Sequence, residues 1–332
     1  MAAAAKNVRD AIPGRRGASS RDWRAARRVF GWRFTRVDEG GTLRRAMANH
    51  DKVIITCAMS GVVTTRAQCP AIPYTVDDFA REAKRAWEAG ASVLHIHARD
   101  DDGAPDYTAA RYRAIGDAIR AACPIVLNFS TGTIDPEGRK APHITDYKPE
   151  IGALNMGSMN YAKYNAKRKG WVFNFVFENS FDYITELLTK MNDSGVKPEL
   201  ECFDTGHVSS VEPLIDMGLL KPPLDFSLVM GVVGGIKATT RHLAFQADNL
   251  PPGSTWKVVG ISREQWSLCA AALTLGGNIR VGLEDNFYLP DGAMARSNGD
   301  LVEKAAQMVR DVGRQVATVD EARAMLNLPA RG

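Results

Sequence analysis

The sequence predicts one α/β domain, an eight-stranded (β/α)8 TIM barrel, preceded by a basic N-terminal extension. From residue 52 onward, short runs rich in β-branched residues alternate with helical patterns, which is typical of βαβ units and a parallel sheet. Eight such runs occur, and their starts are spaced by about 32 residues on average, the length of one barrel unit. Chemically reactive polar residues follow nearly every run.

We expect residues 1–50 to be an arm outside the core and residues 51–332 to be the catalytic barrel. The arm holds 12 of the 42 Lys and Arg residues and 4 of the 38 Asp and Glu residues, which leaves 30 cations and 34 anions in the barrel. It has no sustained apolar period and reads as a solvated extension or as a clamp on a neighbouring subunit. Met47 leaves open an upstream start assigned in error. Residues 1–46 carry no candidate site residue, so we expect them to be dispensable for catalysis.

The predicted strands alternate with helices along the barrel region. A helix over Thr75–Ala89 is favoured by a threonine cap followed by two aspartates, and a second is expected over Tyr107–Ala122. A doubly wound sheet would also alternate, but it would usually carry a glycine-rich fingerprint after its first strand, where this chain has MSGVVT. The barrel is therefore favoured. The eight predicted strands are Lys52–Met59, Ser92–Ala98, Ile125–Phe129, Ile151–Asn155, Lys197–Phe203, Leu224–Met230, Trp256–Ile261 and Asn278–Gly282.

The composition restricts the class of protein. With 45% hydrophobic and 24% charged residues, the chain can bury a large core. No apolar run of transmembrane length and no secretory apolar core occur, so we expect a cytoplasmic protein that does not enter a membrane. The five cysteines form no CxxC pair and are expected to be reduced packing residues. The slight acidic excess of the barrel argues against a nucleic-acid-binding surface.

Candidate site residues lie at the ends of the predicted strands, where barrel enzymes place their active sites. Nearly all of these positions are polar. In chain order they are Ser60, His95 and His97, Ser130-Thr131, Asn155 with Ser158, Glu201 with Asp204 and His207, Ser262 with Arg263, and Glu284-Asp285.

The residues His95 and His97 predict a metal site. Because they are two apart on a strand, both imidazoles point to the same face. A lone buried histidine is more often a hydrogen-bonded core residue than a metal ligand, but one ion can bind both imidazoles of such a pair. Glu284 is the candidate third ligand, since strands 8 and 2 both neighbour strand 1 in a closed barrel. Glu284-Asp285 could instead cap the following segment, and Arg280 could steady a carboxylate, hold a substrate anion or form an interior salt bridge. We expect Zn²⁺, or another divalent transition metal, with one position left open.

The motifs of this chain resemble those of the β-keto acid cleavage enzymes, a family once known as a domain of unknown function. The resemblance covers about Lys52 to Leu328. It is carried by ITCAMSG, IPYT with EAGASVLHIHARD, NFSTGT, LNMGSMN, PELECFDTGH, GGNIRVGLEDN and QVATVDEARAML.

The resemblance implies roles for individual residues. The family's zinc ligands match His95, His97 and Glu284, in agreement with the site inferred above. Its catalytic aspartate matches Asp285, with Arg280 as the partner of that carboxylate. The residues that hold the carboxylate of the keto acid match Ser130, with its neighbour Thr131, and Asn155, where some members have threonine. Glu201 matches an active-site glutamate.

A departure at Val63 bears on the substrate. Members that act on amino-keto acids carry a glutamate after the first strand, which meets the ammonium of the substrate, and this chain has Val63 at that place. We expect a neutral or apolar β-keto acid, or an acidic one if Arg263 or Lys237 reaches the pocket.

The implied reaction converts a β-keto acid and acetyl-CoA to acetoacetate and a new acyl-CoA by a Claisen and retro-Claisen route. Zinc would polarise the keto oxygen while Asp285 takes the α-proton. The resemblance also implies a homo-oligomer, a tetramer. Two alternatives remain. An amidohydrolase-like hydrolase would take further ligands from the middle strands, where only His207 fits. A non-enzymatic acyl-CoA sensor would have lost Asp285 or a ligand, and none is lost.

Overall fold

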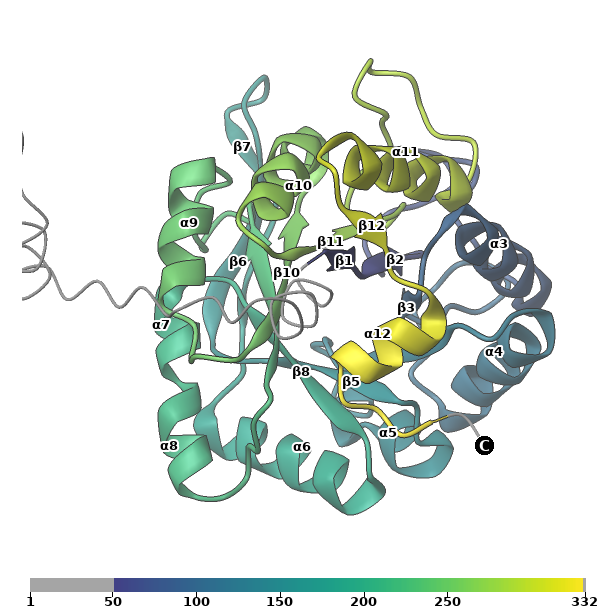
Figure 1. The fold of residues 1–332 in the computed structure, drawn as a ribbon. Helices are drawn as coiled ribbons and strands as arrows, with labels where there is room; N and C mark the ends of the chain where they lie inside the picture. Colours follow the sequence, from purple (N-terminus) through teal and green to yellow (C-terminus); the bar gives the residue numbers. More distant parts are fainter. Residues whose placement is uncertain (1–50, 331–332) are drawn as a thin grey trace, which may run out of the picture. The chain divides into compact units, whose positions relative to one another are not determined.

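The computed structural model describes residues 51–330, and their fold is the expected TIM barrel. Eight parallel strands close in the order β10-β11-β2-β3-β4-β5-β8-β9, and helices surround them (Figure 1). The barrel strands are β2 (Ile55–Ala58), β3 (Val93–Ile96), β4 (Val126–Ser130), β5 (Ile151–Asn155), β8 (Lys197–Cys202), β9 (Asp225–Met230), β10 (Thr255–Gly260) and β11 (Asn278–Val281). Each overlaps one predicted strand. The predicted arm, residues 1–50, lies outside the described residues.

The helices follow the strands, with short helices in several connections. Thr75 caps α3 through a capping box with Asp78, as its sequence pattern predicts. Thr108 caps α4, so this helix begins two residues after the predicted start at Tyr107. The α-helices are α3 (Val76–Ala89), α4 (Ala109–Ala122), α5 (Pro142–Tyr147), α6 (Phe181–Ser194), α7 (Thr205–Ser209), α8 (Val211–Asp216), α9 (Thr240–Asp248), α10 (Gln265–Thr274), α11 (Asn298–Asp311) and α12 (Val319–Met325). The 3₁₀ turns are Gly138–Lys140 and Ser262–Glu264.

The first predicted strand is divided in the structure. The backbone N–H of Ile54 donates to the side chain of Asn278 at 2.8 Å, which interrupts the strand ladder. The two residues before it form β1 (Lys52–Val53), which pairs with β12 (Gln315–Val316) and not with a barrel strand. The prediction of one strand over Lys52–Met59 was therefore wrong at its amino end.

The amino-terminal mouth of the barrel is covered by α12, which lies across it in Figure 1. Ala322 and Leu326 pack in one cluster with the apolar residues Ile54, Val93 and Ile151 from the strand starts. This packing covers the starts of β2 to β5, and the polar residues that follow the strands lie at the opposite, carboxyl end of the barrel. No helix in residues 51–330 combines the length and apolar character required to span a bilayer.

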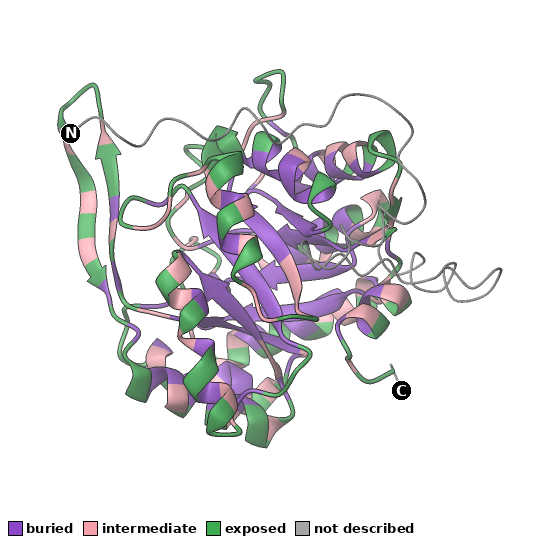
Figure 2. Ribbon diagram, turned by 60° about the vertical axis from the view of Figure 1, so that its left-hand side comes forward, coloured by how far each residue is buried: buried purple, intermediate pink, exposed green. Residues whose placement is uncertain are grey.

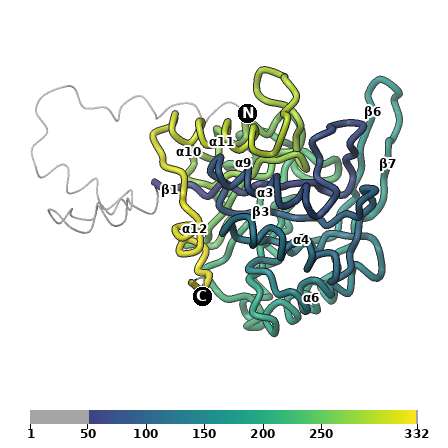
Figure 3. The backbone as a smooth tube through the Cα atoms, turned by 90° about the vertical axis from the view of Figure 1, so that its right-hand side faces the viewer, coloured from purple at the N-terminus to yellow at the C-terminus, as the bar shows by residue number. Residues whose placement is uncertain are grey.

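An antiparallel hairpin, which we did not predict, follows β5. It consists of β6 (Met159–Asn165) and β7 (Gly170–Phe177). Figures 2 and 3 show it projecting from the barrel as a two-stranded ribbon, with many exposed residues along its length. Its base contributes to the site described next.

Candidate active site

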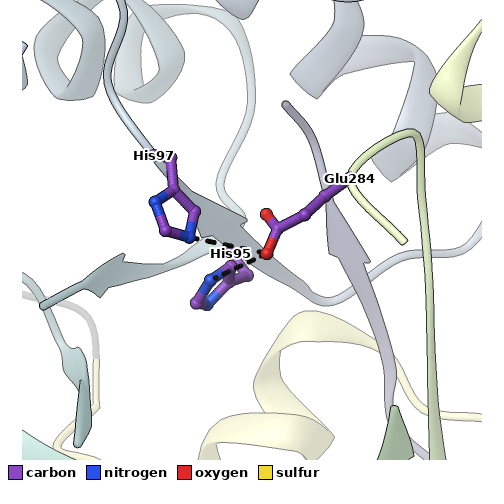
Figure 4. A group of neighbouring side chains, drawn as sticks. All are labelled: His95, His97 and Glu284. Carbon is purple, nitrogen blue, oxygen red and sulfur yellow. Dashed lines mark ion pairs between the residues drawn. The ribbon is translucent and has the colours of Figure 1, made fainter. Parts of the chain in front are cut away.

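His95, His97 and Glu284 converge at the carboxyl ends of β3 and β11, as the barrel order requires (Figure 4). The Nε2 atom of His95 lies 3.6 Å from Oε1 of Glu284, and that of His97 lies 3.5 Å from the same oxygen. These separations are long for N–H···O hydrogen bonds. Two ligands bound at about 2.1 Å to one tetrahedral ion stand about 3.4 Å apart, so the spacing suits a shared zinc-like ion.

The protonation and charge of this cluster also fit a divalent cation. Burial, with Arg280 nearby, lowers the pKa of His95 to about 3, so its imidazole is the neutral form that metals bind. Burial favours neutral Glu284, but Arg280 and the two histidines hold the pKa of this carboxyl well below its usual range. Three carboxylates, of which Glu201 and Asp285 are buried and Glu284 is partly buried, face the single guanidinium of Arg280, and a divalent ion would balance the excess negative charge.

A second group with metal-ligand potential, formed by His95, Glu199 and Glu201, has ligand atoms within 4.8 Å of one another. The oxygens of Glu199 are already engaged. They lie 2.6 Å from Nζ of Lys257 and accept hydrogen bonds from Ser227 and Asn128. The group of His95, His97 and Glu284 is therefore the better candidate centre.

Arg280 holds Asp285 with two nearly parallel hydrogen bonds, Nε to Oδ2 at 2.9 Å and Nη2 to Oδ1 at 3.0 Å. It also donates to Glu284 at 2.6 Å and to Glu201 at 3.3 Å. Burial raises the pKa of Asp285 to about 6 and that of Glu201 to about 7, against the opposing charge of Arg280. A carboxylate with a pKa in this range can accept a proton and return it near neutral pH.

These groups lie in one cavity of about 310 Å³. Its lining includes nine of the ten predicted site residues: His95, His97, Glu284, Asp285, Arg280, Glu201, Ser130, Asn155 and Val63. Val63 is 55% exposed and lies at the mouth. The exception is Thr131, whose hydroxyl donates to the carbonyl of Ala153 and which does not line the cavity. The Thr131 side chain therefore links the residue after β4 to β5 and does not face the cavity.

The other polar residues at the strand ends lie outside the cavity. His207 accepts the backbone N–H of Phe203 on Nδ1 at 3.2 Å, and its ring fills the space beside Gly157. Arg263 lies over the ring of Tyr288, and neither Arg263 nor Lys237 lines the cavity. Among residues 51–330, Arg280 is therefore the one lysine or arginine in the cavity lining that could meet an acidic substrate tail.

The loop after β2 is held by hydrogen bonds to Arg99 on one side and to Glu284 on the other. Arg99 is buried and donates to the carbonyls of Ser60 at 3.0 Å and Gly61 at 2.8 Å. The N–H of Gly61 in turn donates to Oε2 of Glu284 at 3.2 Å. Gly61 has φ +55°, and a Cβ there would stand 2.8 Å from the Cγ of Glu284, so glycine permits the close approach that orients the carboxylate.

The hairpin supplies an aromatic wall that sequence reasoning missed. Tyr161, Phe175 and Phe177 line the cavity, and Phe203 packs against them from the end of β8. The alternation in GWVFNFVF after the basic turn AKRKG was the available signal. This wall makes the outer half of the cavity apolar.

A buried polar layer lies beneath the site, inside the barrel. Nζ of Lys257 is 2.6 Å from Glu199 and 3.0 Å from Asp225, and all three side chains are almost fully buried. Glu199 and Glu201 are two apart on β8, so both point into the barrel. Glu201, nearer the carboxyl end of β8, faces Arg280, and Glu199 faces Lys257.

Comparisons with known proteins identify a family and several relatives that this chain resembles. The model of a family described as beta-keto acid cleavage enzyme matches residues 52–328. The chain is 38% identical over 280 residues to a 3-keto-5-aminohexanoate cleavage enzyme of Fusobacterium nucleatum, covering 84% of this chain and 98% of that protein. It is 35% identical to a 3,5-dioxohexanoate:acetyl-CoA acetone transferase of Paraburkholderia graminis, covering 85% and 97%. A 3-oxoadipate:acetyl-CoA acetyltransferase of Cupriavidus necator is 32% identical, with 83% and 95% covered.

Solved structures support the fold. The complex of ObcA with oxaloacetate matches with a TM-score of 0.64 and 22% identity, covering 80% of this chain and 69% of that one.

The alternative amidohydrolase-like site gains no support from the geometry. In the described residues, the cavity is lined by no lysine and by no histidine other than His95 and His97.

Proposed function

Because the chain belongs to the β-keto acid cleavage enzyme family, we propose that it exchanges acyl groups between a β-keto acid and acetyl-CoA, giving acetoacetate and a new acyl-CoA. The observation that carries this proposal is the convergence of His95, His97 and Glu284 beside Asp285, which Arg280 holds in place. The curated relatives from Paraburkholderia graminis and Cupriavidus necator carry names with acetyl-CoA as co-substrate.

The three ligands would hold a divalent ion, with zinc favoured by two nitrogens and one oxygen. Such an ion would act as a Lewis acid on the keto oxygen and so make the neighbouring carbon more acidic. This is the chemistry that the protein side chains alone do not supply.

Asp285 is the proposed base. It removes a proton from the α-carbon of the keto acid and returns a proton when the product forms. The α-carbon forms a new bond to the acetyl carbonyl carbon, whose bond to sulfur breaks. The bond between the α-carbon and its original acyl carbon breaks in turn, and that acyl group joins the CoA sulfur. Atoms balance without an oxidant or a reductant.

Arg280 positions Asp285 and keeps the charge of the carboxylate cluster tolerable in a buried space. Ser130 and Asn155 lie at the cavity wall, where their polar groups would orient the carboxylate of the keto acid. Glu201 lines the same cavity and lies 3.3 Å from Arg280, which supports a role for it in proton exchange with the reacting groups.

The preferred substrate is a β-keto acid with an uncharged, apolar chain. Val63, Ile134 and Val259 line the cavity together with the aromatic wall. An ammonium group placed there would find no carboxylate at Val63 to pair with, whereas apolar contact contributes about 25 cal/mol per Å².

The test is a panel of β-keto acids with uncharged, cationic and anionic chains, each incubated with acetyl-CoA and scored for acetoacetate. We expect the highest kcat/KM for an uncharged chain. Absence of acetoacetate from every member of the panel, with metal-loaded protein, would overturn the proposed reaction.

A further inference from the structure

The hairpin formed by β6 and β7 connects the cavity with a group of cations at its far end. Cross-strand partners share a face of a ribbon, and Tyr161 pairs with Phe175 as Lys163 pairs with Phe173. Tyr161, Phe175 and Phe177 line the cavity. Phe173 stacks on Tyr161 with ring centroids 6.1 Å apart. One face of the hairpin therefore runs from the cavity outward as aromatic rings and ends at Lys163.

The far end carries four cations: Lys163, Lys167, Arg168 and Lys169. All four are exposed. The ion pairs found between residues 51 and 330 involve none of them. Like charges crowded on a short turn repel one another, and a polyanion bound there would remove that cost. The turn is thus suited to a ligand with several negative charges close together.

We propose that this hairpin is the CoA-binding arm, with its aromatic face along the pantetheine chain and its cationic turn, Lys163 and 167–169, on the phosphates of the nucleotide. The inference rests on the proposed function, because that function brings acetyl-CoA to the cavity. The charge of the arm and the charge of the cofactor are complementary.

The dimensions agree. From sulfur to the first phosphorus, pantetheine spans about thirteen covalent bonds, equal to about four residues of extended chain or roughly 15 Å. From Tyr161 at the cavity to Asn165 at the end of β6, an antiparallel strand rises about 3.4 Å per residue, or roughly 14 Å. An acetyl-CoA whose sulfur lies in the cavity at the level of Tyr161 would therefore bring its phosphates to the end of β6, beside the basic turn.

Binding of CoA would also account for the presence of this hairpin beside the site. The hairpin is an insertion between β5 and β8, and its strands pair with each other while its base rests on Phe203. It adds nothing to closure of the barrel, whose strands are complete without it. A long ribbon retained beside the site is consistent with a co-substrate much longer than the keto acid.

The experiment compares acetyl-CoA with acetyl-pantetheine, which has the same thioester and lacks the phosphates. The test variant carries Lys167→Gln, Arg168→Gln and Lys169→Gln. We expect its kcat/KM for acetyl-CoA to fall roughly tenfold, the combined scale of three exposed charge contacts. The kcat/KM for acetyl-pantetheine should fall far less. Calorimetric titration with CoA itself should give a dissociation constant that rises with salt more steeply in the wild type than in the variant.

A matched control removes three exposed cations elsewhere on the barrel, by Lys84→Gln, Lys221→Gln and Arg310→Gln. It changes net charge equally and should leave kcat/KM for acetyl-CoA unchanged. If the turn variant and this control behave alike, the hairpin proposal is overturned, while acetoacetate formation by the wild type would leave the proposed function standing. If the wild type neither binds CoA nor forms acetoacetate, both proposals are overturned.

Discussion

Replacing Asp285 by asparagine tests the role of the proposed base without changing its size. The side chain contributes two hydrogen bonds to Arg280, and an amide oxygen can keep one of them. Arg280 also retains Glu284 and Glu201, so the cluster should stay folded and the metal ligands are untouched. One hydrogen bond and the ability to accept the α-proton are lost. Removing a positioned base costs roughly 10²-fold to 10⁴-fold in rate, which is about 3 to 5 kcal/mol on the barrier.

The assay is acetoacetate formation under saturating acetyl-CoA, with metal content and unfolding temperature measured on the same preparation. Asp204→Asn is the matched control, because Asp204 is exposed and does not line the cavity. We expect Asp285→Asn to keep its metal and its unfolding temperature while turnover falls at least 10²-fold. A variant that retains more than half of wild-type turnover would show that Asp285 serves structure and would refute the proposed base.

Three further outcomes are expected. Elemental analysis of protein expressed with ample metal should find one divalent ion per chain, lost in His97→Ala; less than roughly 0.2 equivalents in the wild type would contradict the site. Val63→Glu should move kcat/KM toward amino-keto acids by roughly fivefold, the scale of an exposed ion pair, and a wild type that already prefers such substrates would contradict the role of Val63. Lys257→Met should lower the free energy of unfolding by about 3 to 5 kcal/mol in urea denaturation, because two buried carboxylates lose their cation. Lys197→Met, on a half-buried lysine that donates to the carbonyl of Pro223, is the control and should cost far less.

The barrel was predictable because most strands are buried on both faces and read as short apolar or β-branched runs that alternate with helical patterns. The candidate metal centre followed from two facts of geometry: alternate residues of a strand share a face, and strand 8 returns to strand 1 in a closed barrel. Those arguments bring His95, His97 and Glu284 together across nearly 190 residues of sequence. Their roles as ligands remain predictions.

The parts that sequence reasoning missed depend on contacts that no local pattern carries. The break at Ile54 depends on the side chain of Asn278, which lies more than 220 residues away. Thr131 was grouped with Ser130 as a neighbour, but successive residues point in different directions and its hydroxyl turns to Ala153. The hairpin was hidden in the longest interval between predicted strands, where a barrel template expects a loop and a helix.

The short pairing of β1 with β12 and the cover provided by α12 have a consequence for the order of folding. During synthesis, the first barrel strand emerges long before residues 315–326, which complete the amino-terminal mouth. Until then the apolar side chains of Ile54, Val93, Val126 and Ile151 are not covered by α12. A nascent or truncated chain that ends before β12 therefore exposes an apolar patch at the starts of four adjacent strands. We expect such a chain to bind chaperones and to aggregate. Residues 315–326 thus determine when these strand starts become covered as the chain is made.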